Sequence, residues 1–445
     1  MHGGFPQGSE ATTLAASGYP WEDGLLPLTH ACLLTIALLG ALGSAVSAQG
    51  TGPRKVLVID LDDLGVELLQ ATPTPHLDSL AAQGRYFSRF YAAPMCTPAR
   101  VLAQLGARGS RVEVRCIGNV QNTNDYRLPT EPFTPLGVRV QTSGKRAMKI
   151  GKWHLCSDDT LAHPTAFGWL PYVGVMGNLG PAGGDWFNYP ENAAGTSHSV
   201  TNTYLTTRET DLALRAVHDG YDLISLSYHA PHKPFHDPPS YLHTIPLPLV
   251  FNWDRARAAL QALDTELARL TPMALALGYT VIIYSDNGLA ATLGGDKGTV
   301  YEGGVRTMLW ALGPGIVPGQ DDSVIELVDL YATVLALLGI PQGPLAGPDS
   351  VSFEPLLLGG SAPGTIAIAE RGTLAGADPH LQPDTWRRMA CEQRFKLIVN
   401  QDLLMPRLFD LQNDPGEQVD LLAGPSLSNT AAQAFVALRA ALAGL

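Results

Sequence analysis

The sequence is poor in cysteine and in basic residues. Its five cysteines are scattered over 445 residues without a CxxC pair, which argues against a zinc site of that type and against a dense disulfide framework. Lysine and arginine number 29 against 41 aspartates and glutamates, so the formal net charge is -12. This deficit argues against nucleic acid and against an acidic membrane surface as partners. An anionic substrate would therefore need a local cluster of cations.

Residues 1–48 lack lysine and arginine altogether, but they contain a long apolar run from Ala31 to Ala48. The run ends in small residues, with Val46 and Ala48 in the positions that signal peptidase prefers, so we expect cleavage before Gln49. The segment is interpreted as a signal peptide or an uncleaved leader. We therefore expect an exported protein, periplasmic or extracellular, which contacts a membrane only if this segment remains as an anchor.

Short apolar runs, each followed by polar residues, recur along the chain from Lys55 onward. Such runs are typical of strands buried on both faces of a parallel sheet. The four predicted strands end just before acidic, basic or histidine-containing segments, and they cover residues 55–59, 146–150, 223–228 and 279–284. Because ligands bind at the carboxyl ends of the strands in open α/β sheets, we expect one site built from these four segments.

The pattern predicts an α/β fold, with a large mixed, mostly parallel sheet sandwiched by helices. Amphipathic segments at Asp254–Leu270 and Val324–Leu338 predict packing helices, and the Gly/Pro-rich stretch 158–199 predicts long ordered loops over a pocket. After a Gly/Pro-rich linker the pattern changes to short strands and a terminal helix. We expect a catalytic domain over residues 53–345 and a smaller C-terminal α+β domain over 346–445.

Four residues after these strands offer only oxygen ligands: Asp62, Asp63, Asp286 and Asn287. Such a set suits a hard cation, Ca²⁺ first and Mg²⁺ second, because Ca²⁺ accepts irregular cages of ~6–8 oxygens. Asp62–Asp63 and Asp286–Asn287 could instead be a helix cap and a surface turn, since aspartate and asparagine are common in both.

The segment Pro94–Arg100 places a cysteine two residues before a proline and four before an arginine. If a helix starts near Pro98, Cys96 and Arg100 face one another at its opening turn. The backbone N–H groups there would favour an anion held at Cys96. A buried structural cysteine beside a turn proline is the alternative, because free cysteines are usually core residues.

Further charged and histidine residues belong to the same predicted edge. Taken singly, Lys152 and Lys297 would be solvated lysines, and His154 and His232 would be ordinary core or surface histidines. Together with the cysteine segment, however, they resemble the formylglycine-dependent sulfatases of the alkaline phosphatase superfamily. The resemblance rests on segments found in the family's order: Leu61–Gly65, Thr74–Asp78, Cys96–Arg100, Gly151–Leu155, Pro231–Pro234, Ser285–Gly288, Lys297–Arg306, Leu408–Leu411 and Asn413–Glu417.

The resemblance implies that a maturing enzyme oxidises Cys96 to formylglycine, whose hydrated aldehyde binds the metal and attacks the sulfur of a sulfate ester. It implies that Asp62, Asp63, Asp286 and Asn287 hold this metal together with the converted Cys96. Arg100 would steady the nucleophile, and Lys152 and Lys297 would bind the sulfate. His154 would be the base that expels sulfate, and His232 the acid toward the leaving alcohol. The substrate would be a sulfate-ester small molecule or a sulfated sugar.

Some positions depart from the family pattern, and two other functions stay open. Gln104–Arg108 replaces the family's Leu-Thr-Gly-Arg, no residue between 158 and 199 matches the family's serine near the sulfate, and His229 could compete with His232. A phosphate or phosphonate ester hydrolase would keep the metal and the lysines, with Thr97 or an unconverted Cys96 as nucleophile. A non-catalytic sulfatase-like binding protein is the second alternative.

Overall fold

The computed structural model describes residues 54–112, 128, 131–180, 183–361, 364–372, 387–400 and 403–444. The predicted leader and its cleavage site lie outside these residues. None of the helices in the described part is both long enough and apolar enough to cross a membrane.

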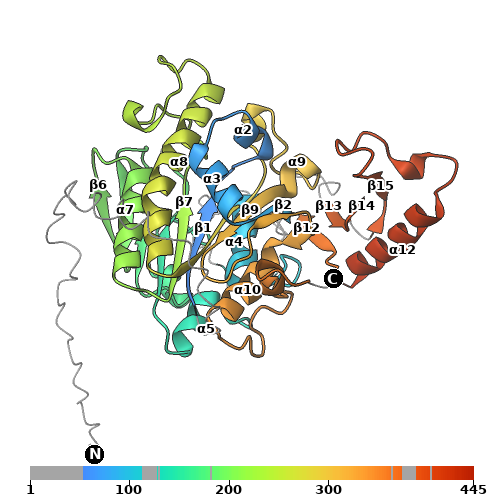
Figure 1. Cartoon of the computed structure of the whole chain (residues 1–445), viewed down its shortest axis with the longest axis horizontal. Helices are drawn as coiled ribbons and strands as arrows, with labels where there is room; N and C mark the ends of the chain where they lie inside the picture. Colours follow the sequence, from blue (N-terminus) through green and yellow to red (C-terminus); the bar gives the residue numbers. More distant parts are fainter. Residues whose placement is uncertain are drawn as a thin grey trace, which may run out of the picture. The chain divides into compact units, whose positions relative to one another are not determined.

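A large mixed sheet forms the centre of the fold, and most of its strand pairs are parallel, as the sequence predicts (Figure 1). In the part that the structure describes, the strand order is β10-β2-β9-β8-β1-β7-β3-β4-β5-β6, with β11 paired to β2. The strands are β1 (Lys55–Leu61), β2 (Arg85–Tyr91), β3 (Ala147–Gly151), β4 (Tyr172–Gly174), β5 (Tyr189–Ala193), β6 (Thr196–Val200), β7 (Leu223–Tyr228), β8 (Tyr279–Ser285), β9 (Arg306–Leu312), β10 (Gly319–Asp321) and β11 (Ile325–Glu326).

Helices cover both faces of this sheet. Alternate residues of β1 enter two different cores: Val56 and Val58 pack with α4 and α10, whereas Leu57 and Ile59 pack with α7 and α8. The helices are α2 (Val66–Gln70), α3 (Pro75–Gln83), α4 (Cys96–Leu105), α5 (Leu136–Thr142), α6 (His163–Ala166), α7 (Leu205–His218), α8 (Asn252–Ala276), α9 (Glu302–Val305), α10 (Leu330–Leu337), α11 (Glu354–Leu357) and α12 (Asn429–Ala443), with short 3₁₀ turns at Ser240–Leu242, Ala291–Leu293, Leu327–Asp329 and Leu421–Ala423.

The four strands predicted from apolar runs are β1, β3, β7 and β8, and they lie side by side. β1 pairs in parallel with β7 on one side and with β8 on the other, and β3 pairs in parallel with β7. Every residue of β3, β7 and β8 is buried, and so is every residue of β1 after Lys55, so none of these strands has a solvent-exposed face. All four therefore end at the same edge of the sheet.

Three local predictions are wrong. The segment Val324–Leu338 is not one helix: Ile325 and Glu326 pair with β2, and α10 begins only at Leu330. This sheet pairing overrides a helical pattern that local sequence alone favours. The stretch 158–199 is not only loop, because it contains α6, β4, β5 and β6, and β4 extends the sheet by pairing with β3. Finally, α4 begins at Cys96 rather than near Pro98.

The C-terminal region contains a second, antiparallel sheet of four strands in the part described. Its strands are β12 (Ala367–Arg371), β13 (Arg387–Cys391), β14 (Phe395–Asn400) and β15 (Arg407–Asp410), paired in this order. Leu438 and Leu442 of α12 pack with Leu397 and Leu408 in a core of their own. This agrees with the predicted α+β character, and the boundary at residues 345/346 stays a prediction.

Candidate active site

The register of the central strands brings their polar ends together. Leu61 at the end of β1 is level with Tyr228 of β7 and with Ser285 of β8. Asp62 and Asp63 therefore leave the sheet beside the segment that carries His232, and beside Asp286 and Asn287. One edge of the sheet thus gathers residues that are more than 200 positions apart in the sequence.

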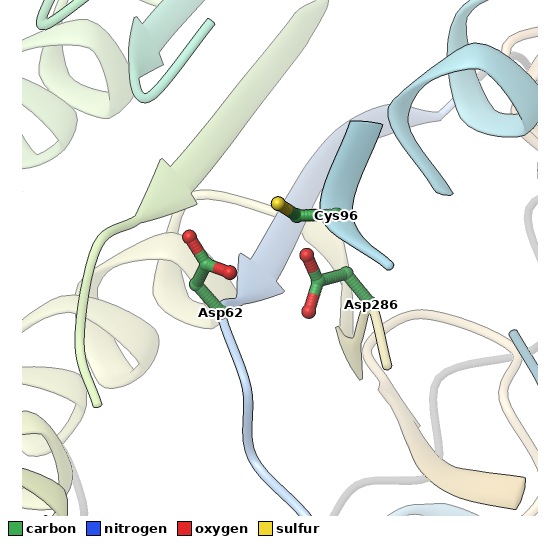
Figure 2. Close-up of side chains that lie close together, drawn as sticks. All are labelled: Asp62, Cys96 and Asp286. Carbon is green, nitrogen blue, oxygen red and sulfur yellow. The ribbon is translucent and has the colours of Figure 1, made fainter. Parts of the chain in front are cut away.

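Three of these side chains form the centre of the cluster. Figure 2 shows Asp62, Cys96 and Asp286 pointing toward one another, from the end of β1, the start of α4 and the end of β8. One ligand atom of each lies within 4.8 Å of the others, and all three side chains are buried. A second such group joins Asp62 and Asp63 to His232.

Each of the four predicted metal ligands has one buried oxygen without a hydrogen-bond partner among the described residues. These atoms are Asp62 Oδ1, Asp63 Oδ2, Asp286 Oδ2 and Asn287 Oδ1. A buried oxygen without a donor is unfavourable, and four of them at one place fit the oxygen ligand set of a hard divalent cation. The structure therefore brings the predicted metal ligands together in an arrangement that fits a metal ion.

The electrostatics of the cluster point the same way. Burial, together with the neighbouring charges of Asp62 and Asp60, raises the pKa of Asp286 well above its usual range. Burial is the largest single influence on the pKa of Asp62 and acts to raise it, but the nearby charges of Lys152, His232, Arg100 and Lys297 together outweigh burial and hold that pKa well below its usual range. A divalent cation would favour the charged form of every carboxylate here.

Two lysines border the carboxylates. The Lys152 ammonium pairs with Asp62, and the Lys297 ammonium pairs with Asp63, which also accepts a 2.8 Å hydrogen bond from Asn287 Nδ2. Lys152 is fully buried, whereas the Lys297 side chain keeps 14% of its surface exposed. Both lysines that the sequence placed at the site therefore lie against the acidic cluster, and they come from two different segments of the chain.

Cys96 is the first residue of α4, and four positions later Arg100 lies on the same side of the helix. The Cys96 side chain is buried, which raises the pKa of its thiol. Arg100 Nη1 donates a 2.8 Å hydrogen bond to the carbonyl oxygen of Lys152. Its Nη2 lies 3.1 Å from Asp60 Oδ2 and 3.8 Å from Asp62 Oδ2. The sequence interpretation gave Asp60 no role.

His154 lies directly beside the cysteine. Its Nδ1 is 3.3 Å from Cys96 Sγ and 3.2 Å from Thr97 Oγ1. Burial and the nearby charge of Lys152 hold the pKa of His154 well below its usual range, which favours the neutral imidazole. His154 has a left-handed backbone conformation, with φ of 58°, that is uncommon for residues other than glycine.

Asn178 completes the surroundings of His154, and the sequence interpretation missed it. Its Nδ2 is 3.3 Å from His154 Nε2. The contact arises because the His154 amide donates a 2.8 Å hydrogen bond to the carbonyl oxygen of Met176, which precedes Asn178 by two residues. Asn178 belongs to the stretch 158–199, whose composition predicted loops over a pocket but did not indicate which of its residues reaches the site.

The two histidines after β7 have different surroundings. His232 Nδ1 donates to the Lys233 carbonyl at 2.5 Å, which leaves Nε2 facing the cluster, 3.7 Å from Asp63 Oδ2. His229 points to other partners, with Nδ1 2.7 Å from Glu209 Oε1 and Nε2 3.1 Å from the Gly177 carbonyl. Because both ring nitrogens of His229 are engaged, the geometry favours His232 as the histidine of the site.

Two backbone hydrogen bonds hold the loop at Lys297 and at the next residue, Gly298. The backbone N–H of Lys297 bonds to the carbonyl of Leu289, and that of Gly298 bonds to the carbonyl of Pro94, close to Cys96. Beyond it, Glu302 at the start of α9 lies 2.9 Å from the ammonium group of Lys396 in the second sheet. Glu302 and Arg306, which belong to the predicted motif, form an ion pair at 2.9 Å and do not join the metal cluster.

Comparison with known proteins connects this geometry to a family. A family model described as Sulfatase matches residues 54–340. The chain is 28% identical to arylsulfatase A of Bos taurus, over 91% of the chain and 89% of that protein. It is 24% identical to N-acetylgalactosamine-6-sulfatase of Rattus norvegicus, over 87% of the chain and 85% of that protein.

Solved structures have a similar fold. The crystal structure of Ps i-CgsB matches with a TM-score of 0.71 and 21% identity, over 83% of this chain and 89% of that one. The PsFucS1 sulfatase from Pseudoalteromonas sp. matches with a TM-score of 0.64 and 19% identity, over 83% and 86%. These similarities extend through the large sheet and into the C-terminal part of the chain.

Proposed function

The chain belongs to the sulfatase family and is a sulfuric ester hydrolase, and we propose that it acts through a formylglycine made from Cys96 together with a Ca²⁺ ion. The observation that carries this proposal is the meeting of four partnerless buried oxygens with Cys96, at a site bordered by Lys152 and Lys297. A dedicated maturing enzyme would convert the cysteine.

The residues present fit both groups. Asp62, Asp63, Asp286 and Asn287 would hold the cation, with position 96 facing it, and oxygen-only ligands favour Ca²⁺ over Mg²⁺ where the cage is irregular. When bound, the formylglycine supplies the nucleophile as a hydrated aldehyde, and the cation lowers the pKa of that nucleophile and neutralises ester oxygens.

The cationic side chains orient the sulfate group. Lys152 and Lys297 approach the cluster from two sides, so together they bind the sulfate oxygens on which charge grows in the transition state. Arg100 lies behind position 96 and is held by the Lys152 carbonyl, which fits the role of steadying the nucleophile.

The two histidines take separate proton-transfer roles. Burial favours the neutral form of His154, and its Nδ1 lies 3.3 Å from the side chain at position 96. In the tautomer that carries the ring hydrogen on Nε2, with the Asn178 amide turned so that its oxygen faces that hydrogen, Nδ1 would accept a proton from the nucleophile's hydroxyl as sulfate leaves. His232 presents Nε2 to the other side of the cluster. Because its Nδ1–H is engaged by the Lys233 carbonyl, His232 would have to carry a second proton, on Nε2, to act as the acid toward the departing alcohol, and burial opposes this form by lowering its pKa to about 4.

The proposed substrate is a sulfate-ester small molecule or a sulfated sugar. Similar proteins carry the names arylsulfatase A and N-acetylgalactosamine-6-sulfatase, and a structure of similar fold contains its substrate D-glucosamine-2-N,6-O-disulfate. A sugar substrate agrees with export, which we propose from the apolar leader. Export would place the enzyme in the periplasm or outside the cell.

Mass spectrometry combined with an activity assay tests the proposal. Protein made in a host that produces formylglycine is digested with trypsin, and the peptide Phe90–Arg100 is weighed. We expect an aldehyde in place of the Cys96 thiol, and hydrolysis of an aryl sulfate in proportion to the aldehyde content. Full activity with an intact thiol would refute the formylglycine. Faster hydrolysis of the matched phosphate or phosphonate ester would favour that class of hydrolase, and no turnover of any ester would favour a binding protein.

A further inference from the structure

A chain of buried polar side chains runs through the sheet behind the active site. Lys149 of β3 donates to Ser225 Oγ at 3.2 Å and to Ser227 Oγ at 2.5 Å, both on β7. Ser227 Oγ in turn donates to Asp60 Oδ2 of β1 at 3.1 Å. The same carboxylate oxygen lies 3.1 Å from Arg100 Nη2 on α4. The chain therefore ends on the helix that begins with Cys96.

Strand register explains why these residues meet. Lys149 is level with Ser225, and Ser227 is level with Asp60, across three neighbouring parallel strands. Because side chains alternate between the faces of a strand, Asp60 lies on the same face of β1 as Val58, and Asp62 follows directly after the strand ends at Leu61. The row of polar residues is thus one step deeper in the sheet than the metal ligands.

Burying this row is unfavourable by itself. Lys149 and Asp60 are each 3% exposed, and the other strand residues on this face of the sheet, such as Val58 and Ala147, are apolar. Taking an ammonium group or a carboxylate out of water costs several kcal/mol unless it is paired. Burial and the charge of Arg100 also lower the pKa of Lys149, to about 7. An aliphatic side chain at position 149 would avoid this cost, so the lysine calls for an explanation beyond packing.

A small cavity adjoins the row. It measures about 20 Å³ and is lined by polar side chains, Asp60, Arg100, Gln104, Lys149, Ser225 and Ser227, together with aromatic and aliphatic ones. Asp60 Oδ1, Arg100 Nε and Arg100 Nη2 are buried without a hydrogen-bond partner among the described residues, so the 3.1 Å contact of Nη2 with Asp60 is an ion pair without hydrogen-bond geometry. A space of about this size with two to four polar neighbours can hold one water molecule. Such a water would bridge Asp60 Oδ1 and Arg100 Nε by hydrogen bonds.

Two carboxylates lie within ion-pair distance of the Arg100 guanidinium. Its Nη2 is 3.1 Å from Asp60. The carboxylate of Asp62, a proposed metal ligand, is slightly farther from the same atom, at 3.8 Å. If Asp60 lost its charge, the guanidinium would pair with Asp62 instead. That pairing would oppose binding of the cation and would turn Arg100 away from the Lys152 carbonyl.

We propose that Asp60 and Lys149 are positioning residues for the reaction: through Ser227 they hold Arg100 beside position 96 and keep it from pairing with the metal ligand Asp62. The activity part of this proposal rests on the proposed function. The part that concerns metal affinity rests only on the proposed cation site, and calorimetry tests it without any sulfate ester being hydrolysed.

The test compares Asp60→Asn, Lys149→Met and the double variant with the unchanged enzyme. Ca²⁺ affinity is measured by calorimetry, and kcat and KM are measured on an aryl sulfate with kcat expressed per aldehyde. We expect Asp60→Asn to weaken Ca²⁺ binding and to lower kcat by about tenfold each, with Lys149→Met less severe, as is usual for residues that orient a metal site from outside it. KM should change less, because Lys152 and Lys297 remain. The double variant should be no worse than Asp60→Asn, since both changes act through Arg100.

The matched control is Met148→Leu. Met148 is the neighbour of Lys149 on β3, equally buried, but it packs in the core on the opposite face of the sheet. This variant should keep the Ca²⁺ affinity and kcat of the unchanged enzyme, whatever it does to the melting temperature.

Several outcomes would overturn the proposal. It fails if Asp60→Asn and Lys149→Met lower only the melting temperature, while Ca²⁺ affinity and kcat stay within about twofold of the unchanged enzyme. It also fails if the two changes are additive. Should Asp60→Asn not fold, Ser227→Ala removes the hydroxyl that joins the two residues, and an unchanged kcat and Ca²⁺ affinity there would be equally decisive. If the unchanged enzyme hydrolyses no sulfate ester, the proposed function fails, and calorimetry still decides the positioning role.

Discussion

The ammonium group of Lys152 pairs with the carboxylate of Asp62, and neither side chain has any exposed surface. Asp62 Oδ2 serves the lysine, while Asp62 Oδ1 has no hydrogen-bond partner in the described part of the chain. One carboxylate thus joins the proposed cation site to the proposed sulfate site. The proposed Ca²⁺ and the proposed sulfate group would therefore lie on either side of the Asp62 carboxylate.

Asp286→Asn should change stability in opposite directions with and without metal. Burial and the neighbouring aspartates disfavour the charge of Asp286, so in chelator the variant should be at least as stable as the unchanged protein. In Ca²⁺ the variant should be less stable, because it loses a ligand. Thermal unfolding in calcium and in chelator measures both effects.

An exposed aspartate provides the control for that experiment. Asp211 pairs with Arg269 at the surface of α7, away from the cluster, so Asp211→Asn should leave the calcium-induced rise in melting temperature unchanged. An equal calcium-induced rise in Asp286→Asn and in the unchanged protein would contradict the metal assignment. Stoichiometric zinc in the purified protein would also contradict it.

The two active-site histidines should respond differently to the leaving group. If His232 protonates the alcohol, His232→Ala should hardly affect an activated aryl sulfate but should strongly slow an alkyl or sugar sulfate, whose leaving group is more basic. His154→Ala should slow both kinds of substrate alike and let the sulfated enzyme accumulate. Rates across esters of graded leaving-group pKa measure this. The same fractional loss for every ester in His232→Ala would remove the acid role from that residue.

The stability of the protein should rise with pH above neutrality because of Lys149. Its pKa is about 7 in the folded protein, where it faces Arg100, Asp60, Glu209 and the two serines of β7, whereas the unfolded chain keeps the proton up to about pH 10. Between these values the unfolded state binds more protons, so unfolding becomes harder by about 1 kcal/mol per pH unit. Below about pH 7 both states are protonated and this contribution stops changing.

Denaturant unfolding at pH 7.5 and pH 9 detects this effect. The unchanged protein should gain stability relative to Lys149→Met between the two values, since methionine does not titrate. Equal changes in both proteins would show that Lys149 keeps an ordinary pKa in its buried position.

Lys396 should be important for stability although it lies far from the chemistry in the sequence. Its ammonium group is fully buried, 2.9 Å from Glu302 and 3.0 Å from Glu417. Lys396→Met would leave two buried carboxylates facing each other, which should lower the free energy of unfolding by about 3 kcal/mol. The control is Arg394→Met on the same segment, whose ion pair with Asp410 is much more exposed and should contribute much less. Comparable losses in the two variants would contradict the argument.

The central fold was predictable because its signals are local. The run Lys55–Ile59 is continuously apolar and forms a strand buried on both faces, and the polar residues after it mark the edge where ligands bind. The residues at the ends of β1, β3, β7 and β8 could therefore be grouped before any geometry was known. Each of the four strands indicates the same edge of the sheet without reference to the others.

The missing parts depend on contacts that no local pattern encodes. Asn178 reaches His154 only because the backbone of residues 175–176 bonds to the segment Trp153–His154. Ile325 and Glu326 pair with β2, and this distant pairing decides between strand and helix. Lys149 and Asp60 are single charges within or beside apolar runs, and only the register of three strands shows that they belong together.

The closest contacts of the site join residues very far apart along the chain. The Asp63 backbone N–H donates to the side chain of Asp286, which is 223 residues away in the sequence. The Lys297 ammonium group donates to the Asp63 carboxylate from 234 residues away. Contacts of such long range form late, because closing a large loop precedes any gain from it. A chain that has not yet placed β8 beside β1 has no site for cation or sulfate, so both ligands stabilise only completed molecules. Binding at this edge thus reports that β1, β3, β7 and β8 have been assembled side by side.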